Sequence, residues 1–196
     1  MVYVARDGQF LGSVLIADEV KEHSKQAIAA LKAQGVRTIM LTGDSEAVAS
    51  EISGQLGLDE YHAQLLPADK VNRVEELLAT KGKNDILTFA GDGINDAPVL
   101  AGADVGAAMG SGADAAIEAA DVVFMTSDVA AVPQALRISR QTARIAWQNV
   151  VFALAVKLAV MILGLCGYAS MWLAVIADSG VALLCVLNSI RILYKK

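Results

Sequence analysis

Two long apolar stretches near the C-terminus constrain the fold of this chain more than any other feature. Residues 150–167 are apolar except for Lys157, and residues 172–190 are apolar except for Asp178, Ser179, Asn188 and Ser189. As helices, each stretch would be about 27–29 Å long, which matches the hydrocarbon core of a bilayer. We therefore predict a hairpin of two transmembrane helices. Two buried core helices of a soluble protein are the alternative.

The charge distribution divides the chain at the same place. Residues 1–136 hold 9 Lys and Arg against 20 Asp and Glu, whereas residues 137–196 hold 7 against 1. The basic residues flank the outer ends of the two apolar stretches, so the positive-inside rule places both ends of the hairpin in the cytoplasm. We expect a multi-pass protein of the plasma or inner membrane, with the lipid bilayer as a partner. The distribution gives no support for nucleic-acid binding.

The acidic part alternates between short apolar runs and helical patterns, which is typical of an α/β domain with a parallel sheet. The runs predict strands at residues 2–5, 9–17, 38–41, 85–90, 105–108 and 122–125. The segments between them predict helices at residues 21–34, at residues 45–56 and from residue 67 onward. Helices that alternate with parallel strands cover both faces of the sheet.

These patterns divide the chain into five segments. We place the α/β domain at residues 1–136 and a linking helix at 137–149. The predicted transmembrane helices and the basic cytoplasmic tail follow at residues 150–167, 172–190 and 191–196.

Polar residues follow two of the predicted strands, at the sheet edge where such domains bind ligands. Asp92 and Asp96 in the first of these loops offer the hard oxygen ligands that Mg²⁺ prefers. The second loop, Thr42-Gly43-Asp44, offers a hydroxyl and N–H groups for phosphate oxygens. Lys70 adds a positive charge that can offset a phosphoryl transition state. Each motif alone is also a common turn or helix cap, so the ordered set carries the prediction of phosphoryl chemistry.

Here the chain resembles the C-terminal portion of a P-type ATPase. The motifs TGD at 42–44, LLPADKV around Lys70 and GDGINDAPVL at 91–100 match the phosphorylation domain of that family, which has a haloacid dehalogenase-like fold. The resemblance implies that Asp92 ligates the catalytic Mg²⁺ and that Asn95 and Asp96 support the ion and the phosphate. It also implies that Lys70 stabilises transferred charge, and that Thr42, Gly43 and Asp44 contact phosphate and nucleotide.

The sequence departs from that family in what it lacks. The family's phosphate acceptor is an aspartate in a DKTGT sequence, which does not occur here. The nucleotide-binding insertion, the actuator domain and the earlier membrane helices are also missing. We therefore expect the chain to work with ATP only together with the remaining domains of a pump, and the isolated chain to be inactive.

Two charged residues lie within the apolar stretches. Lys157 follows Arg144 by 13 residues and Asp178 precedes Arg191 by 13 residues, so an antiparallel hairpin places both at nearly the same depth. Burying either ion alone in lipid costs at least about 2.5–3.5 kcal/mol, so we expect them to face each other or a polar cavity. A purely structural ion pair is the alternative.

This Lys and Asp resemble the pair in the last two helices of the P-type ATPases that export zinc, cadmium and lead. The resemblance implies that Asp178 binds the transported ion and that Lys157 serves as its counter-charge. A carboxylate also suits a divalent cation better than copper(I), which favours sulfur ligands.

Two other functions stay open from the sequence. One is a membrane-anchored phosphatase of the dehalogenase type with Asp18 as nucleophile, although Asp18-Glu19-Val20 lacks the second carboxylate that such enzymes use as acid and base. Asp18 can equally cap a helix. The other is a regulatory or metal-chaperone fragment that binds without turnover.

Overall fold

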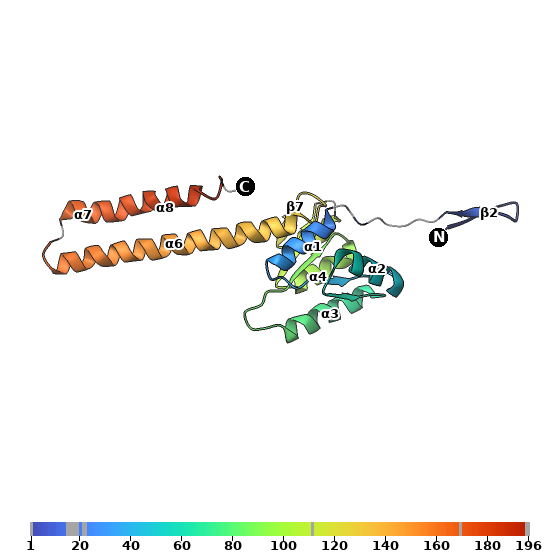
Figure 1. The fold of residues 1–196 in the computed structure, drawn as a ribbon. Coiled ribbons are helices and arrows are strands. Elements are labelled where there is room, and N and C mark those ends of the chain that lie inside the picture. The colour runs from blue at the N-terminus through green and yellow to red at the C-terminus, as the bar shows by residue number, and fades with distance from the viewer. Residues whose placement is uncertain (1, 15–19, 21–22, 111, 169, 195–196) are drawn as a thin grey trace. The chain divides into compact units, whose positions relative to one another are not determined.

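The computed structural model of the chain describes residues 2–14, 20, 23–110, 112–168 and 170–194. These residues form two compact units, residues 1–131 and 132–196, and each unit is described by itself (Figure 1).

The first unit begins with a β-hairpin. Strand β1 (Val2–Arg6) pairs antiparallel with β2 (Gln9–Val14). Asp7 and Gly8 between them both have positive φ angles, 51° and 77°, as the favoured two-residue hairpin turns require. The turn chemistry therefore fixes this hairpin locally.

The remaining strands are all parallel, as predicted, but they form two sheets. Strand β3 (Ile39–Leu41) pairs with β4 (Glu60–His62) in one sheet. The other has the order β5-β6-β7 and consists of Thr88–Gly91, Val105–Met109 and Val122–Phe124. Among the described residues, β3 and β5 each pair on one side only. The sequence pattern missed β4, because its three residues include Glu60 and His62 and are only half-buried.

Five helices and a short 3₁₀ turn complete the described part of this unit. The helices are α1 (Ser24–Ala33), α2 (Glu46–Leu56), α3 (Pro67–Thr80), α4 (Ala97–Gly102) and α5 (Asp114–Ala119), and the 3₁₀ turn η1 spans Ile94–Asp96. Helix α3 begins with Pro67, whose missing N–H costs nothing at this position. The Asp69 carboxylate accepts the Leu66 N–H (3.0 Å), which satisfies a donor that the helix leaves free.

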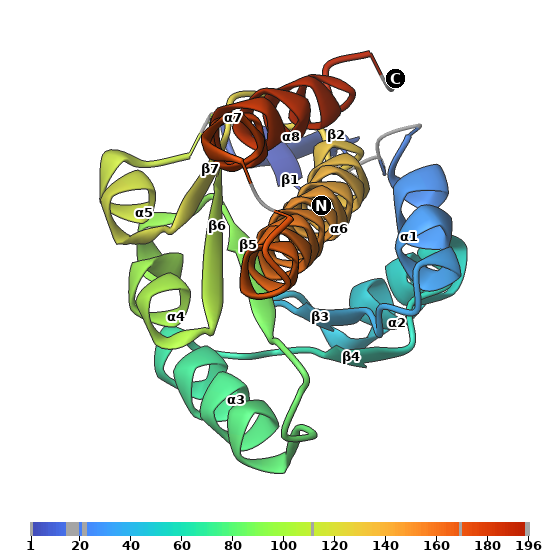
Figure 2. The same ribbon diagram turned by 90° about the vertical axis from the view of Figure 1, so that its left-hand side faces the viewer.

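The core of this unit lies where α4 and α5 pack against β6 (Figure 2). Val99 and Leu100 of α4 are fully buried there, together with Ala108 of β6 and Ala116 of α5. A Cβ at Gly106 would lie 2.4 Å from the carbonyl oxygen of Leu100, so only glycine lets the helix approach the strand this closely. This packing fixes the loop that joins β5 to α4.

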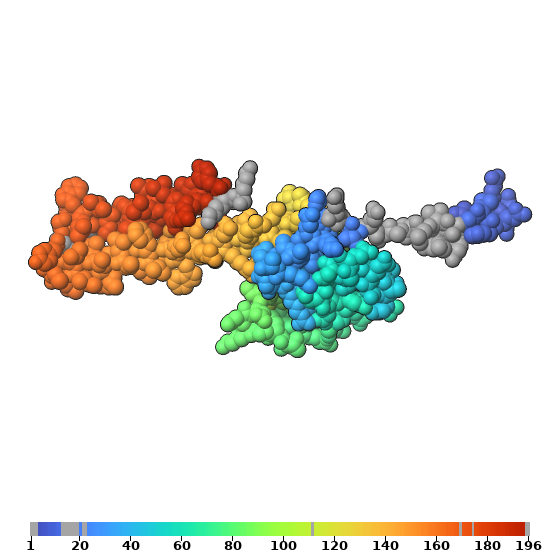
Figure 3. Space-filling view, in the orientation of Figure 1, coloured from blue at the N-terminus to red at the C-terminus, as the bar shows by residue number. Residues whose placement is uncertain are grey.

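The second unit is a helical hairpin. Helix α6 (Ala131–Leu165) continues without a break through the predicted linking helix and most of the first predicted span. The second arm consists of α7 (Met171–Val175), a π-helical turn at Ile176–Gly180 and α8 (Val181–Ile190). The two arms lie side by side and in contact, in orange and red in Figure 3. Both are long and apolar enough to cross a membrane, each with a mean hydropathy of 2.0. The π-helical turn was not predicted.

Candidate functional site

Asp96 lies at the centre of a polar cluster beyond the end of β5. The loop after β5 turns through η1 into α4, and this turn places the Asp96 side chain inward with 11% of its surface exposed. Its Oδ1 accepts a hydrogen bond from Lys70 Nζ (2.8 Å), and its Oδ2 accepts one from the Gly93 N–H (3.2 Å). Both oxygens are therefore engaged within the protein.

Lys70 reaches this cluster from the first turn of α3. Its side chain is 19% exposed, so the ion pair with Asp96 is largely removed from water. Charge-assisted bonds of this kind are stronger than neutral ones, and breaking a buried pair leaves an uncompensated charge. The pair thus joins the loop after β5 to the helix that follows β4.

The Thr42–Asp44 loop is bound to the segment that leads into α3. The Thr42 N–H donates to the His62 carbonyl (2.9 Å), and the Leu65 N–H donates back to the Thr42 carbonyl (3.1 Å). The Thr42 hydroxyl donates to the Asp44 carboxylate (2.7 Å) and accepts from the Asp44 N–H (3.1 Å). The loop is therefore ordered by its own side chains and is tied, through residues 62–65, to the helix that carries Lys70.

Asp92 differs from Asp96 in exposure and in partners. Among the described residues its carboxylate makes no hydrogen bond or ion pair, and the side chain is exposed. Its backbone is fixed, because the Ala113 N–H donates to the Asp92 carbonyl (3.0 Å). A Cβ at Gly112 would lie 2.9 Å from that carbonyl oxygen, so glycine is required for this approach. Asp92 therefore has an exposed carboxylate and a backbone that is fixed by a hydrogen bond.

This donor set fits Mg²⁺, which binds few protein oxygens and keeps several waters. The Asp92 carboxylate is available as a ligand, and the exposed amide of Asn95 immediately precedes the engaged Asp96. In the described part of the chain no three His, Cys, Asp or Glu side chains gather as a closed metal cluster. The arrangement therefore fits an ion held by one or two protein oxygens, with Asp96 supporting Lys70.

A second charged network lies on β4 and was not recognised in the sequence. Glu60 Oε1 lies 2.7 Å from His62 Nε2 and 3.1 Å from Arg73 of α3, and Arg37 pairs with its other oxygen. Burial raises the pKa of Glu60, but the bonds from His62 and Arg73 outweigh this and leave it lowered. The three polar or charged residues Asp59, Glu60 and His62 in this four-residue segment were the one signal available in the sequence.

Asp59 at the start of this segment is held more strongly. It lies 2.7 Å from Lys32 and accepts hydrogen bonds from the Thr38 N–H and hydroxyl (both 2.8 Å). The bond from Lys32, followed by those from Thr38, lowers the pKa of Asp59 to about 2. These bonds fix β3 to β4 at their N-terminal ends, opposite the Thr42–Asp44 loop.

The two charged residues of the hairpin lie together. Lys157 Nζ of α6 is 3.2 Å from Asp178 Oδ1, and 60% and 75% of the two side chains are exposed in the hairpin by itself. Asp178 lies within the π-helical turn, and such turns are frequent at functional sites. The adjacent Ser179-Gly180, with weak helix propensity, was the only sequence signal for this turn.

One predicted candidate cannot be placed. Asp18, the possible phosphatase nucleophile, lies outside the described residues. Of the other predicted site residues, the structure brings together Lys70 and Asp96, and Lys157 and Asp178. It places Asp92 and Asn95 on the exposed side of the loop that holds Asp96.

Comparison with known proteins extends this description. Residues 2–104 match the haloacid dehalogenase-like hydrolase family. The chain is 50% identical over 198 residues to the cadmium, zinc and cobalt-transporting ATPase of Bacillus subtilis, and 54% identical over 194 residues to the zinc-transporting ATPase of Synechocystis sp.. These matches cover 100% and 98% of the chain but only 28% and 27% of the relatives.

A solved structure shows the same similarity to metal-transporting ATPases. The chain is similar to a crystal structure of a zinc-transporting PIB-type ATPase in the E2.Pi state, with 38% identity and a TM-score of 0.86. That match covers 97% of the chain and 31% of the crystallised one. The similarity therefore includes both the α/β unit and the helical hairpin.

Proposed function

We propose that this chain, which belongs to the haloacid dehalogenase-like hydrolase family, works as part of an ATP-driven exporter of zinc, cadmium and lead. It corresponds to the C-terminal part of a zinc- and cadmium-transporting P-type ATPase. It spans less than a third of such a pump. The observation that supports the proposal is the presence of two ion pairs in one chain. Lys70 pairs with Asp96 of the loop that contains Asp92, and Lys157 pairs with Asp178 in the hairpin.

The α/β unit provides the magnesium- and phosphate-binding half of a phosphorylation site. Asp96 holds Lys70 so that its ammonium group can offset charge on a transferred phosphoryl group. In the Thr42–Asp44 loop, the Gly43 N–H can donate to a phosphate oxygen and the Thr42 hydroxyl can turn from Asp44 to another, and Asp92 would hold Mg²⁺. Magnesium, when bound, neutralises charge on the phosphate oxygens.

The acceptor of the phosphoryl group comes from the remaining part of the pump, because this chain has no DKTGT sequence. The edges of β3 and β5 support this, since both strands end at candidate phosphate-binding loops and, among the described residues, both leave backbone groups unpaired on one side. A further strand that carries the acceptor aspartate would pair with such an edge. ATP binding likewise belongs to the remaining domains.

The hairpin provides part of the site for the transported ion. Asp178 binds the divalent cation, and Lys157 withdraws as it binds because the two cations compete for one carboxylate. When the ion leaves, the ammonium group returns to Asp178 and limits rebinding. The outer ends of the hairpin and the α/β unit lie in the cytoplasm, in keeping with the basic residues that flank the apolar stretches.

The test uses the full-length pump that carries this chain, reconstituted in vesicles. We expect ATP hydrolysis and ion uptake that depend on Zn²⁺, Cd²⁺ or Pb²⁺, and loss of this dependence in Asp178→Asn. Asp92→Asn should abolish phosphoenzyme formation, with the exposed Glu118→Gln as control. Metal-independent hydrolysis in the unaltered pump would contradict the proposal.

The phosphatase alternative has a separate test. The isolated chain is assayed with p-nitrophenyl phosphate and Mg²⁺, with and without Asp18→Asn. We expect no turnover from either protein. Hydrolysis that depends on Asp18 would replace the pump proposal.

A further inference from the structure

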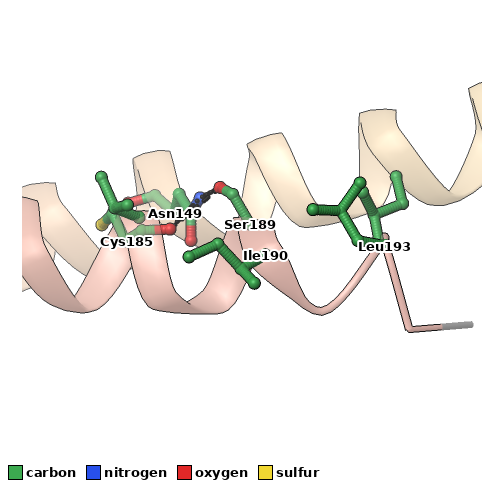
Figure 4. A pocket seen from close by; sticks show the side chains of 7 residues that line it. Asn149, Cys185, Ser189, Ile190 and Leu193 are labelled. Atoms are coloured by element: carbon green, nitrogen blue, oxygen red, sulfur yellow. Dashed lines mark hydrogen bonds between the residues drawn. The ribbon is translucent and has the colours of Figure 1, made fainter.

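A cluster of hydrogen bonds joins the two arms of the hairpin near its open end, away from the Lys157–Asp178 pair. Asn149 of α6 donates from Nδ2 to the Cys185 carbonyl (3.1 Å) and to the Ser189 hydroxyl (2.9 Å) of α8. Its Oδ1 accepts from Asn188 Nδ2 (2.8 Å). Asn149, Cys185 and Ser189 line a pocket of about 430 Å³, together with apolar residues that include Ile190 and Leu193 (Figure 4).

The cluster has few unused polar groups. Ser189 donates its hydroxyl hydrogen to the Cys185 carbonyl (2.9 Å), and Asn188 Oδ1 accepts from Arg191 (2.8 Å). The Cys185 thiol lies 3.7 Å from the Asn149 carbonyl oxygen. Both amide hydrogens and the amide oxygen of Asn149 are therefore used for contacts with α8, which leaves this side chain poorly suited to bind an ion.

We propose that Asn149 is a positioning residue for the transport site, and that its bonds to α8 set the register at which Asp178 meets Lys157. We call Asn149, Cys185, Asn188 and Ser189 the asparagine clasp. The proposal rests on the proposed function of the Lys157–Asp178 pair and adds the residue that places it.

The ion pair by itself does not fix the register of the two helices. Lysine has a long stem and three equivalent donors, so its ammonium group can follow a carboxylate that moves by several ångströms. Most other side chains along the facing arms are apolar and can slide past one another. Each residue of slip moves a helix by about 1.5 Å and turns its side chains by about 100°.

The asparagine amide has the opposite properties. It is short and planar, and its donors and acceptor point in fixed directions. A single buried asparagine is known to fix the register of paired helices in this way. Asn149 lies 8 residues from Lys157, and Cys185 lies 7 residues from Asp178, so the clasp and the ion pair are separated by similar lengths on both arms.

The clasp has a function during transport as well. When a metal ion binds Asp178, it competes with Lys157 and the ion pair opens. The clasp involves none of these groups, so it holds the two arms while the ion is bound. The ammonium group then returns to the same carboxylate after release.

The first experiment measures register without any assay of transport. The 196-residue chain is placed in lipid bilayers with nitroxide labels at Leu154→Cys and Leu184→Cys, two exposed positions, in a Cys166→Ser, Cys185→Ala background that keeps the Cys185 carbonyl. We expect Asn149→Leu to shift or broaden the distance distribution. Gln148→Leu, which removes an exposed amide one residue away, should leave it unchanged. An unchanged distribution in Asn149→Leu would overturn the proposal.

The second experiment tests the consequence for metal binding in the full-length pump. We expect Asn149→Leu to raise the Zn²⁺ concentration for half-maximal ATP hydrolysis by about 10- to 100-fold, as loss of a supporting residue does in metal sites, without changing the KM for ATP. Ser189→Val should shift it in the same direction, whereas Ser189→Thr keeps the hydroxyl and should not. Equal effects of Val and Thr would contradict the clasp.

The two experiments separate the proposals. If the unaltered pump shows no metal-dependent hydrolysis, the proposed function fails while the label distances still test the clasp. If hydrolysis is metal-dependent but the distances do not change in Asn149→Leu, the clasp fails and the proposed function stands. Should Asn149→Leu not fold, the Ser189 pair of variants decides both readouts.

Discussion

Residues of the same type in this chain differ in function because their side chains have different partners and different exposure. Asp92 and Asp96 are four positions apart in one motif, yet one is exposed with its carboxylate unpaired among the described residues and the other is buried against Lys70. The first can accept an ion, whereas the second holds a cation in place. Substitution of the two aspartates should therefore separate stability from function.

Asp96→Asn should destabilise the chain by about 2–3 kcal/mol, because it leaves the Lys70 ammonium group with a neutral partner in a poorly hydrated place. Asp92→Asn should change stability by less than about 0.5 kcal/mol, as exposed substitutions do. Denaturant unfolding of the chain in detergent, followed by circular dichroism, measures both. Equal losses would show that the two carboxylates have equivalent roles.

Asp59 makes the stability of the α/β unit depend on pH in the acidic range. Its pKa is lowered in the folded state to about 2 from the ordinary 3.8, so the stability it contributes is present above about pH 4 and is lost as the pH falls toward 2. Asp59→Asn should therefore lower the unfolding midpoint at neutral pH and flatten its decline between pH 4 and pH 2. The exposed Glu118→Gln is the control, and an unchanged pH profile in Asp59→Asn would contradict the assignment.

Among the elements, the π-helical turn has the most direct influence on the Lys157–Asp178 pair. Its hydrogen bonds span one residue more than those of an α-helix, and it lies between α7 and α8, so it sets the rotation of Asp178 relative to the clasp on α8. The clasp then fixes α8 against α6. The ion pair depends on both elements.

Deletion of Ser179 should convert the turn to α-helix and rotate Asp178 by about 100° relative to α8. We expect the deleted pump to insert in the membrane and to lose most metal-dependent ATP hydrolysis. Ser179→Ala keeps the residue count and should retain it. The measurement is Zn²⁺-stimulated hydrolysis in vesicles, and full activity of the deletion would show that the turn has no such role.

For the molecule as a whole, the notable feature is that α6 runs unbroken from Ala131 to Leu165. A continuous helix is stiff over this length, so a displacement at its first turn reaches Lys157 without being absorbed by a loop. We infer that events at the phosphorylation site are transmitted to the transport site through this helix.

Insertion of a short glycine segment next to Gln141 should interrupt that transmission, because glycine weakens a helix by about 1 kcal/mol per residue. We expect the full-length pump to keep hydrolysing ATP and to lose ion uptake. An insertion of alanines of the same length restores helix propensity and should recover part of the uptake. Undiminished uptake with the glycine insertion would argue against the role of α6.

The sequence by itself determined the features that depend on local pattern. Apolar runs and their spacing predicted the hairpin and the parallel α/β unit with all of its strands except β4, and the motifs identified the loops around Lys70 and Asp96. Only the tertiary structure decided which polar groups meet. The pairing of β4 with β3 and the Asn149 clasp depend on contacts between residues 21–40 positions apart, and no local propensity encodes such contacts.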